Sequence, residues 1–162
     1  MGFEIERRFL VRGNDWQHLS TNHTDIRHAY LTKGDKSSVR VRISDSSIAT
    51  LTVKSRRTEI RRLELEYSIP TLEAEALIAL RQGSIVEKRR YQIPCDDLTW
   101  EVDVFLGENA GLVIAEIELR HEQQHIDLPA WIGEEITGHA QYYNGFLAER
   151  PFCSWSHEVS HA

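Results

Sequence analysis

Hydrophobic and polar residues alternate with a two-residue period along most of this chain. The alternation begins in residues 3–11, where Phe3 and Ile5 take one phase while Glu4 and Glu6 take the other. Successive side chains of a β-strand point to opposite faces, so this period predicts a strand. The same reasoning predicts seven further strands, at about 25–34, 37–44, 48–55, 60–69, 84–93, 98–106 and 112–121.

Three segments depart from the strand period and are expected to be helical. Asn14 and Asp15 can cap a short helix that runs to about Leu19, because their side-chain oxygens satisfy the unpaired amides of a first turn. The residues after Pro70 are good helix formers with apolar positions at helical spacing. A last helix is predicted over residues 136–149, after a Gly-containing approach.

The short connections between the predicted strands favour antiparallel hairpins over long crossovers. Eight antiparallel strands in hairpin order can close on themselves, which removes the exposed sheet edges that invite aggregation. We therefore expect an α+β protein with a closed eight-stranded antiparallel β-barrel and accessory helices. One domain over residues 1–150, including the last helix, is followed by a tail at 151–162.

Composition excludes several classes of protein. The formal net charge of −6 is wrong for a protein that coats nucleic acid, so no nucleic-acid partner is expected. Carboxylates interrupt the first residues, and no later run reaches membrane-spanning length, so we expect no membrane association. Cys95 and Cys153 lie far apart without zinc-site spacing. These features fit a cytoplasmic protein with reduced thiols.

Nearly every predicted strand carries charged residues on one of its two faces. In a single strand, this pattern is usual for a sheet with apolar side chains inward and charged ones in water. Here, however, the charges are mostly sorted by sign from strand to strand, and the opposite faces are apolar enough to need covering. The charged faces therefore line a cavity in this interpretation. They contain Glu4, Glu6, Arg8, Arg40, Arg42, Lys54, Arg62, Glu64, Glu66, Lys88, Arg90, Glu101, Asp103, Glu116 and Glu118.

A cavity with both kinds of charge suits one type of chemistry. Clustered carboxylates are the ligands of a hard cation such as Mg²⁺ or Mn²⁺, and Arg and Lys side chains bind a multiply charged phosphate chain. Their combination predicts metal-assisted phosphoryl chemistry.

At this point the sequence resembles a known family. Residues 4–11, Glu-Ile-Glu-Arg-Arg-Phe-Leu-Val, are similar to the Glu-x-Glu-x-Lys opening strand of the CYTH superfamily, also called the triphosphate tunnel metalloenzymes. Further segments match the short bacterial branch of that superfamily in order along nearly the whole chain. They are residues 39–43, 51–54, 62–67, 87–91, 100–105, 115–119 and 131–137.

The resemblance implies an eight-stranded tunnel with a divalent metal and a bound triphosphate. The metal, Mg²⁺ or Mn²⁺, would be held by Glu4, Glu6, Glu116 and Glu118, with Asp103 as an addition. The triphosphate would lie against the basic residues that match the family motifs, with two glutamates completing the acidic wall. These substrate-binding residues are Arg40, Arg42, Lys54, Arg62, Lys88, Arg90, Glu64 and Glu66.

The family includes several activities, so the fold alone does not name the substrate. The short bacterial form favours hydrolysis of the terminal phosphoryl group of inorganic triphosphate or a related small-molecule triphosphate. Two alternatives stay open, namely a non-catalytic module that binds triphosphate or polyphosphate, and an adenylyl cyclase of the class IV type. A homodimer is also left open.

One position departs from the family pattern. The opening motif of the family ends in Lys, whereas this chain has Arg8. A buried Lys can be tuned to act as a base, but an Arg stays charged. In some bacterial members that Lys is thought to work beside a Tyr of the second strand, for which Tyr30 is the counterpart here. Arg8 and Tyr30 are therefore the candidate catalytic residues.

Two further features of the sequence receive no role in the predicted site. His121 and His125 lie four residues apart beside Glu122, but they follow a strand and precede a proline, so the helical face of a zinc pair is not expected. The run from Trp155 to His161 is typical of a mobile tail, which near a tunnel mouth could also act as a lid.

Overall fold

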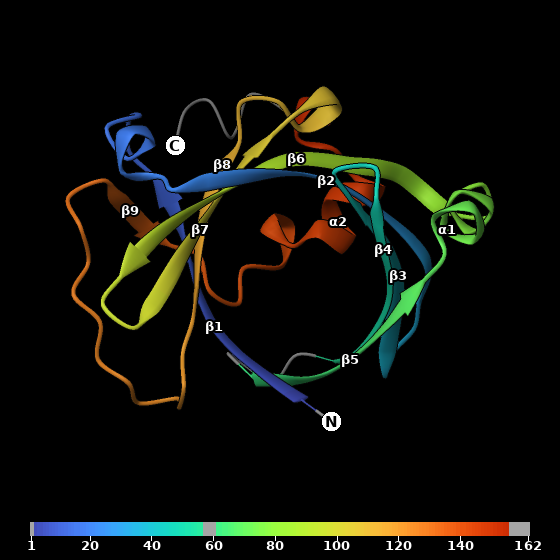
Figure 1. Ribbon diagram of the computed structural model, residues 1–162, viewed down its shortest axis with the longest axis horizontal. Helices are drawn as coiled ribbons and strands as arrows, with labels where there is room; N and C mark the ends of the chain where they lie inside the picture. The colour runs from blue at the N-terminus through green and yellow to red at the C-terminus, as the bar shows by residue number, and fades with distance from the viewer. Residues whose placement is uncertain (1, 57–60, 156–162) are drawn as a thin grey trace.

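The computed structural model describes residues 2–56 and 61–155. Within these ranges, nine strands form a single antiparallel sheet whose ring-like closure is seen in Figure 1. The strands are β1 (Gly2–Val11), β2 (Asn22–Lys33), β3 (Ser37–Ser44), β4 (Ile48–Ser55), β5 (Arg61–Ile69), β6 (Gln82–Cys95), β7 (Leu98–Phe105), β8 (Val113–Glu118) and β9 (Ile132–Glu135).

Eight of these strands close into the expected barrel. They are hydrogen-bonded in the order β5-β4-β3-β2-β6-β7-β8-β1, and an additional pairing of β5 with β1 completes the ring. All eight pairings are antiparallel. The prediction of a closed eight-stranded antiparallel barrel is therefore confirmed. The described part of the predicted strand at 60–69 begins at Arg61, because residue 60 lies outside the described residues.

The ninth strand was not predicted. β9 pairs with the last part of β1, with Phe9 opposite Glu135 and Val11 opposite Ile132. It thereby extends the sheet on the same strand whose first residues, Gly2 to Ile5, pair with β5. The backbone N–H of Ile136 still donates to the carbonyl of Arg8, so this segment is extended where the sequence predicted the start of a helix.

The helices are shorter than the sequence predicted. The segment expected to be helical over 136–149 contains only η3 (Ala140–Tyr142) and α2 (Asn144–Glu149), because Gly138 takes a positive φ of 83° that interrupts a right-handed helix. The expected helix near residues 14–19 is the single turn η1 (Gln17–Leu19). The helix after Pro70 is confirmed as α1 (Thr71–Ile78).

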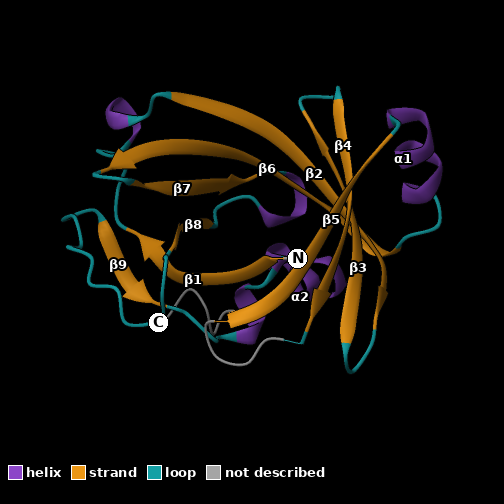
Figure 2. Cartoon of the chain, turned by 60° about the horizontal axis from the view of Figure 1, so that its bottom comes forward, coloured by secondary structure: helices purple, strands orange, loops and turns teal. Residues whose placement is uncertain are grey.

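Two apolar regions on the outer face of the barrel are covered by other parts of the chain. The first cover is α1, whose Ala74 and Ile78 pack on Val41, Ile43 and Ala49 of β3 and β4. Figure 2 shows this helix against the outside of these strands. The second cover is formed mainly by β9 and the preceding chain, and its residues pack on β1, β6, β7 and β8. This core contains Phe9, Trp16, Ile93, Trp100, Val102, Ala115, Ile117, Leu119, Ile126, Trp131 and Ile132.

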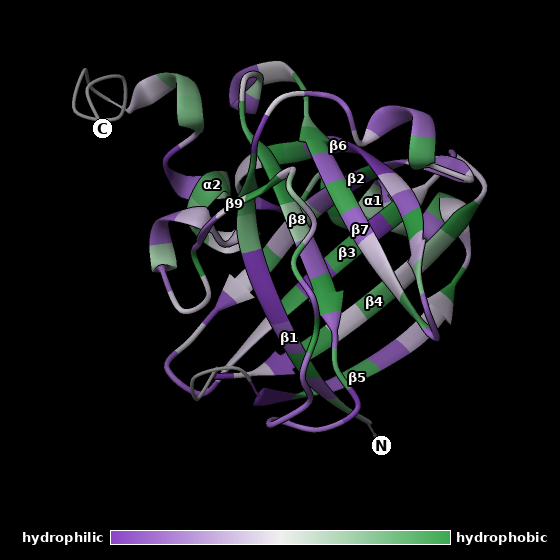
Figure 3. Cartoon of the chain, turned by 90° about the vertical axis from the view of Figure 1, so that its left-hand side faces the viewer, coloured by the Kyte–Doolittle hydropathy of each residue, from purple (hydrophilic) through white to green (hydrophobic). Residues whose placement is uncertain are grey.

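Figure 3 shows hydrophobic and hydrophilic bands alternating along the strands beneath the second cover. Since apolar residues of one phase face outward into these cores, the charged residues of the opposite phase, such as Glu6 of β1 and Glu116 of β8, face the interior of the barrel. The prediction that the apolar faces need covering is confirmed, although a strand and an irregular segment provide much of the cover.

α2 packs at one end of the barrel interior. Its Leu147 and Ala148 are buried against Tyr30, Val86 and Phe105, among other residues of a third core. Two single-turn 3-10 helices, η2 (Gly107–Asn109) and η4 (Phe152–Ser154), contact each other. Among the described residues, no helix has the length and apolar character needed to span a bilayer.

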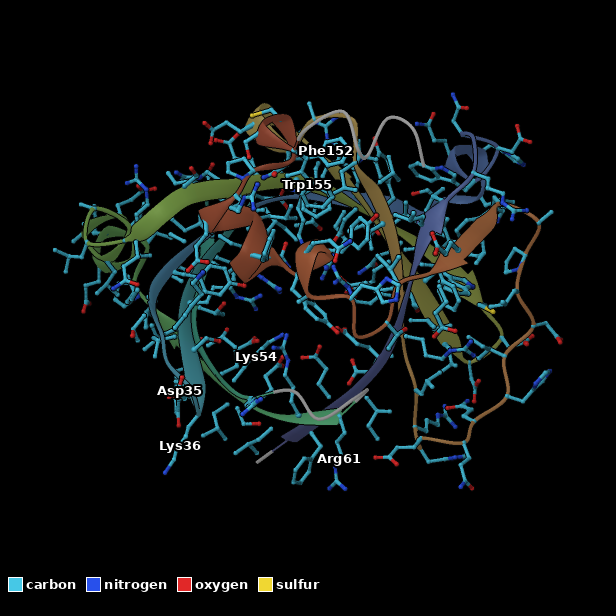
Figure 4. The ribbon with its side chains drawn as sticks, turned by 180° about the vertical axis from the view of Figure 1, so that it is seen from behind. Asp35, Lys36, Lys54, Arg61, Phe152 and Trp155 are labelled. Atoms are coloured by element: carbon cyan, nitrogen blue, oxygen red, sulfur yellow. The ribbon has the colours of Figure 1, made fainter. Side chains whose placement is uncertain are left out.

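The described start of the predicted tail is packed against this end of the molecule. The indole ring of Trp155 makes edge contacts with Tyr142, Phe146 and Phe152, at centroid distances of 5.5, 6.4 and 5.0 Å. Figure 4 shows Phe152 and Trp155 together on this side. The rest of the predicted mobile tail, residues 156–162, lies outside the described residues.

Candidate active site

The charged faces of the strands surround a cavity of about 580 Å³ inside the barrel. This volume falls within the range of small-molecule binding sites. In Figure 4, the labelled Lys54 lies inside the ring of strands, whereas Arg61, Asp35 and Lys36 lie on its outside. The cavity is lined by most of the residues that the sequence predicted, namely Glu4, Glu6, Arg8, Tyr30, Arg40, Arg42, Lys54, Arg62, Glu64, Glu66, Arg90, Glu116 and Glu118.

The acidic wall is formed where β1 and β8 pair. Glu6 lies directly opposite Glu118 and Arg8 directly opposite Glu116, so the glutamates of the first and last strands of the barrel meet. The pKa of Glu6 lies well above its ordinary value, first because the carboxyl is buried, and then because Glu116 and Glu4 repel its charge. The glutamates of this wall therefore repel one another, and full ionisation of all of them is unfavourable.

Lys54 partly balances this wall. Its ammonium lies 2.8 Å from a Glu4 carboxylate oxygen and 3.2 Å from a Glu64 oxygen. Burial opposes ionisation of Glu4. The charge of Lys54 and the hydrogen bonds of Glu4 with Glu6 and Glu64 together outweigh burial, so the pKa of Glu4 falls below its ordinary value. The pKa of Glu64 is raised, mainly by burial. The neighbouring carboxyls therefore differ, since the pKa of Glu4 is lowered while those of Glu6 and Glu64 are raised.

Several buried guanidinium N–H donors, on β1 as well as on β3, find no acceptor among the described residues. Arg8 and Arg40 are nearly inaccessible to solvent, with 1% and 4% of their surfaces exposed. Within the described part of the chain, all three nitrogens of the Arg8 guanidinium and the Nε atoms of Arg40 and Arg42 are buried without a hydrogen-bond partner. Leaving buried charged donors unsatisfied is costly. A ligand with many anionic oxygens would supply the acceptors that these groups lack.

Burial lowers the pKa of Arg42 to about 10, and the neighbouring Arg40 and Arg90 add to this effect. Arg40, Arg42 and Arg90 form a basic wall of the cavity, in which like positive charges lie close together. Arg40 and Arg42 alternate with outward-facing Val41 on β3, which is why both point to the same side of the sheet.

Asp103 is located behind the cavity and does not line it, as judged over the described residues. Its carboxylate, fully buried, lies 2.7 Å from Lys88 Nζ and 2.8 Å from Arg90 Nε. Burial disfavours ionisation of Asp103, but Arg90 and Lys88 outweigh it, so the pKa of Asp103 falls below its ordinary value. In this structure, Asp103 holds two basic side chains in place.

Lys88 is also removed from the cavity lining. It is 1% exposed and donates a hydrogen bond of 3.4 Å to Oδ1 of Asn144 in α2. Burial lowers the pKa of Lys88 to about 8, although Asp103 favours its charged form. Of the six predicted basic ligands, five therefore line the cavity, and Lys88 lies in the layer behind them.

Arg8 and Tyr30 share the cavity, but the ring that faces Arg8 belongs to a different residue. The guanidinium carbon of Arg8 lies 4.8 Å from the ring centroid of Tyr143. Tyr30 packs in the apolar core beneath α2, and Lys33 Nζ lies 5.8 Å from its ring centroid. Whether Tyr30 acts together with residue 8 stays a prediction.

Sequence reasoning placed Glu101 on a charged strand face without giving it a role, and it did not single out His28, Tyr143 or Asn144. Glu101 lines the cavity and lies 3.3 Å from Arg90, and its pKa is raised by burial. It shares the strand phase of Asp103, and this phase is what placed it on a charged face in the sequence. His28 is fully buried, and burial first, then Lys88 and Arg40, holds its pKa well below the ordinary value. Tyr143 and Asn144 come from the irregular C-terminal segment, where no periodic pattern marks them.

The acidic wall fits a divalent cation by its chemistry. Mg²⁺ binds through one or two carboxylates together with water and substrate phosphate oxygens. Among the described residues, no three acidic, His or Cys side chains already surround one point as metal ligands would. The repulsion that raises the pKa of Glu6 is nevertheless what a divalent cation between Glu6, Glu116 and Glu4 would relieve.

Comparisons with known proteins show the family to which this chain belongs. The family model described as CYTH domain matches residues 2–146. The chain is 45% identical over 153 residues to an inorganic triphosphatase of Acetivibrio thermocellus, covering 94% of this chain and 97% of the relative. It is 32% identical to an inorganic triphosphatase of Nitrosomonas europaea, covering 90% and 96%. A crystal structure of an inorganic triphosphatase superposes with a TM-score of 0.65 at 32% identity, covering 91% of this chain and 95% of that one.

Proposed function

This chain belongs to the CYTH domain family, and on that premise we propose that it hydrolyses the terminal phosphoryl group of inorganic triphosphate in a divalent-metal-dependent reaction. The observation that carries the proposal is a set of buried guanidinium N–H donors, on Arg8, Arg40 and Arg42, that find no acceptor among the described residues and share one cavity with a cluster of glutamates. Relatives with 45% and 32% identity that carry the name inorganic triphosphatase support the choice of substrate.

The basic wall would bind the phosphate chain. Planar guanidinium groups match pairs of phosphate oxygens and stay charged at all relevant pH values. Arg40 and Arg42 of β3 and Arg90 of β6 converge on the cavity from strands that flank β2. Their number suits a polyanion with several charged phosphate groups rather than a single phosphate. The compact cavity is consistent with a short, unbranched chain.

We assign the metal to Glu4, Glu6, Glu116 and Glu118, which lie on paired strands of the acidic wall. When bound, Mg²⁺ or Mn²⁺ supplies a Lewis acid that draws charge from the phosphoryl oxygens. Because Asp103 is engaged by Lys88 and Arg90, we place it in a supporting role, where it orients Arg90 toward the cavity.

The protein's own residues then divide the remaining tasks. Arg8 cannot accept a proton, so its role is to stabilise the negative charge on the phosphoryl oxygens. A carboxylate is left to accept the proton of the attacking water, and Glu64 and Glu101 line the cavity outside the assigned metal set with pKa values raised by burial. Attack on the terminal phosphorus breaks its bond to the bridging oxygen, and pyrophosphate and phosphate leave.

A product assay over a panel of substrates tests this proposal. Purified protein is incubated with inorganic triphosphate, ATP or pyrophosphate, each with Mg²⁺ or Mn²⁺, and the products are separated by ion-exchange chromatography. We expect phosphate and pyrophosphate from triphosphate, at a kcat/KM at least about tenfold above that for ATP. Cyclic AMP from ATP would support the cyclase alternative, and binding of triphosphate without any product would support the binding-module alternative.

A further inference from the structure

Tyr143 is part of the cavity wall, although it does not belong to the barrel. It precedes the first residue of α2 and lines the cavity together with Asn144 and Gly145. Its phenol oxygen accepts a hydrogen bond of 2.9 Å from the backbone N–H of Gly138. The ring is therefore fixed at one end by the backbone of the C-terminal segment, while its face is turned toward the barrel.

Two guanidinium groups lie near the face of this ring. The Cζ atom of Arg8 is 4.8 Å from the Tyr143 ring centroid, and the Cζ atom of Arg62 is 6.0 Å from it. Distances of this size allow a favourable interaction between a cation and the electron-rich face of an aromatic ring. Arg8 belongs to β1 and Arg62 to β5, and these strands make the pairing that closes the barrel.

The type of contact matters for Arg8. Its guanidinium is buried, and its three nitrogens make no hydrogen bond with any of the described residues. Glu116 supplies an opposite charge 3.3 Å from Nε. A hydrogen-bonding partner would fix the group but would use its N–H donors. An aromatic ring occupies the face of the group and leaves the in-plane donors available for phosphate oxygens.

We infer that Tyr143 is a positioning residue, which acts through Arg8 by holding its guanidinium against the ring face so that the N–H donors point at the substrate. Arg is suited to this contact because its guanidinium is planar and stacks on rings, whereas an ammonium group is compact. The C-terminal segment thereby contributes to the anion site of the barrel. This inference rests on the proposed function, since the anion that Arg8 contacts is taken to be triphosphate.

A double-mutant cycle tests the coupling between the two residues. Tyr143→Leu removes the ring and Arg8→Gln removes the guanidinium charge, and each is made alone and combined. Tyr143→Phe keeps the ring without the hydroxyl. Tyr142→Leu serves as a matched control, because Tyr142 is the adjacent tyrosine and its ring packs on Trp155. For all variants, kcat and KM for inorganic triphosphate are measured, with calorimetric binding of triphosphate in EDTA and the melting temperature.

We expect Tyr143→Leu to lower kcat about tenfold, equivalent to about 1.4 kcal/mol, with a change in KM of no more than about twofold. Tyr143→Phe should recover most of that loss, and Tyr142→Leu should leave kcat unchanged. In the Arg8→Gln background, Tyr143→Leu should have less than about a twofold further effect. The same loss in both backgrounds, or the same loss in Tyr142→Leu, would overturn the inference.

Different results would contradict the proposed hydrolysis and the role of Tyr143. If wild-type protein binds triphosphate but releases no phosphate, the proposed hydrolysis is wrong, and the same cycle evaluated on the dissociation constants in EDTA decides the role of Tyr143. If wild-type protein neither binds nor hydrolyses triphosphate, both the proposed function and the inference are wrong.

Discussion

Arg90 and Asp103 form a two-point ion pair in the barrel wall, with Nε 2.8 Å from Oδ1 and Nη2 2.9 Å from Oδ2. Two parallel hydrogen bonds fix a guanidinium in both position and orientation. Nη1 of Arg90 also lies 3.3 Å from a carboxylate oxygen of Glu101, and Nη2 lies 3.7 Å from one of Glu116. The pair therefore connects the layer behind the cavity with the charged residues that line it.

Replacing Asp103 by Asn should reduce both stability and activity. The change leaves Arg90 without its anionic partner in a buried site, and such losses are usually 3–5 kcal/mol. We expect about 3 kcal/mol, because Lys88, whose pKa is already lowered to about 8, can give up its proton once Asp103 no longer favours its charge. Urea unfolding at pH 7 measures the loss. Asp97→Asn is the control, because its pair with Arg120 is exposed, and a comparable loss there would contradict this explanation.

Asp103 should also shape the acid side of the stability curve. Its pKa in the folded protein lies below its ordinary value, so its contribution is fully present above about pH 4, the range of its unfolded-state pKa. That contribution is lost as the pH falls through the lower folded-state pKa. We expect the free energy of unfolding to fall more steeply between about pH 4 and pH 2 in the wild type than in Asp103→Asn. Parallel curves for the two proteins would show that Asp103 does not carry this dependence.

Glu118→Gln should separate catalysis from folding. We expect metal-dependent phosphate release to fall about 10- to 100-fold, because one of the proposed metal ligands is lost. The melting temperature should rise by about 1–2 °C, or about 0.5 kcal/mol. The gain is small because Glu118 is solvent-exposed. Partial burial of its side chain, and then repulsion from Glu4, nevertheless raise the pKa of Glu118. Glu122→Gln, at an exposed position outside the barrel cavity, should change neither quantity, and a lower melting temperature for Glu118→Gln would contradict the picture of concentrated like charge.

The placement of α2 depends on a glycine in β6. Gly83 has a φ of 75°, and a Cβ atom built on it would lie 2.5 Å from the carbonyl oxygen of Ala148 in α2. Gly83→Ala should therefore lose about 3 kcal/mol and displace α2 from the end of the barrel, which lowers kcat with it. Gly13→Ala is the matched control, because its φ of 62° is similar but nothing lies within 4 Å of the added Cβ. It should lose only about 1 kcal/mol, and equal losses would show that strain alone explains the effect.

The barrel could be predicted from the sequence because its strands obey a two-residue period with charge on one phase. That period places Glu4 and Glu6, for example, on the same face, and antiparallel closure then brings β1 next to β8. The two-residue period shows which face a side chain lies on, but it does not show how far along the barrel axis that side chain lies. Asp103 and Glu101 share a face, yet register places Glu101 opposite Glu116 at the cavity and Asp103 opposite Ile114 behind it.

The C-terminal part was harder to predict for a different reason. β9 is four residues long and contains consecutive glutamates, Glu134 and Glu135, so it shows no alternation. The positive φ of Gly138 then interrupts what reads as one helix. Tyr143 consequently reaches the cavity through tertiary packing of an irregular segment, and no local pattern predicts that position.

The most direct test of the central claim is phosphate release from inorganic triphosphate by the wild-type protein, in the presence of Mg²⁺ and again with excess EDTA. A matched pair of variants accompanies it, Arg40→Ala at the buried guanidinium that faces the cavity and Arg56→Ala at an exposed arginine outside it. We expect turnover with Mg²⁺ that EDTA abolishes, a loss of about 100-fold in kcat/KM for Arg40→Ala, and wild-type rates for Arg56→Ala. Turnover that persists in EDTA, or that survives Arg40→Ala undiminished, would contradict it.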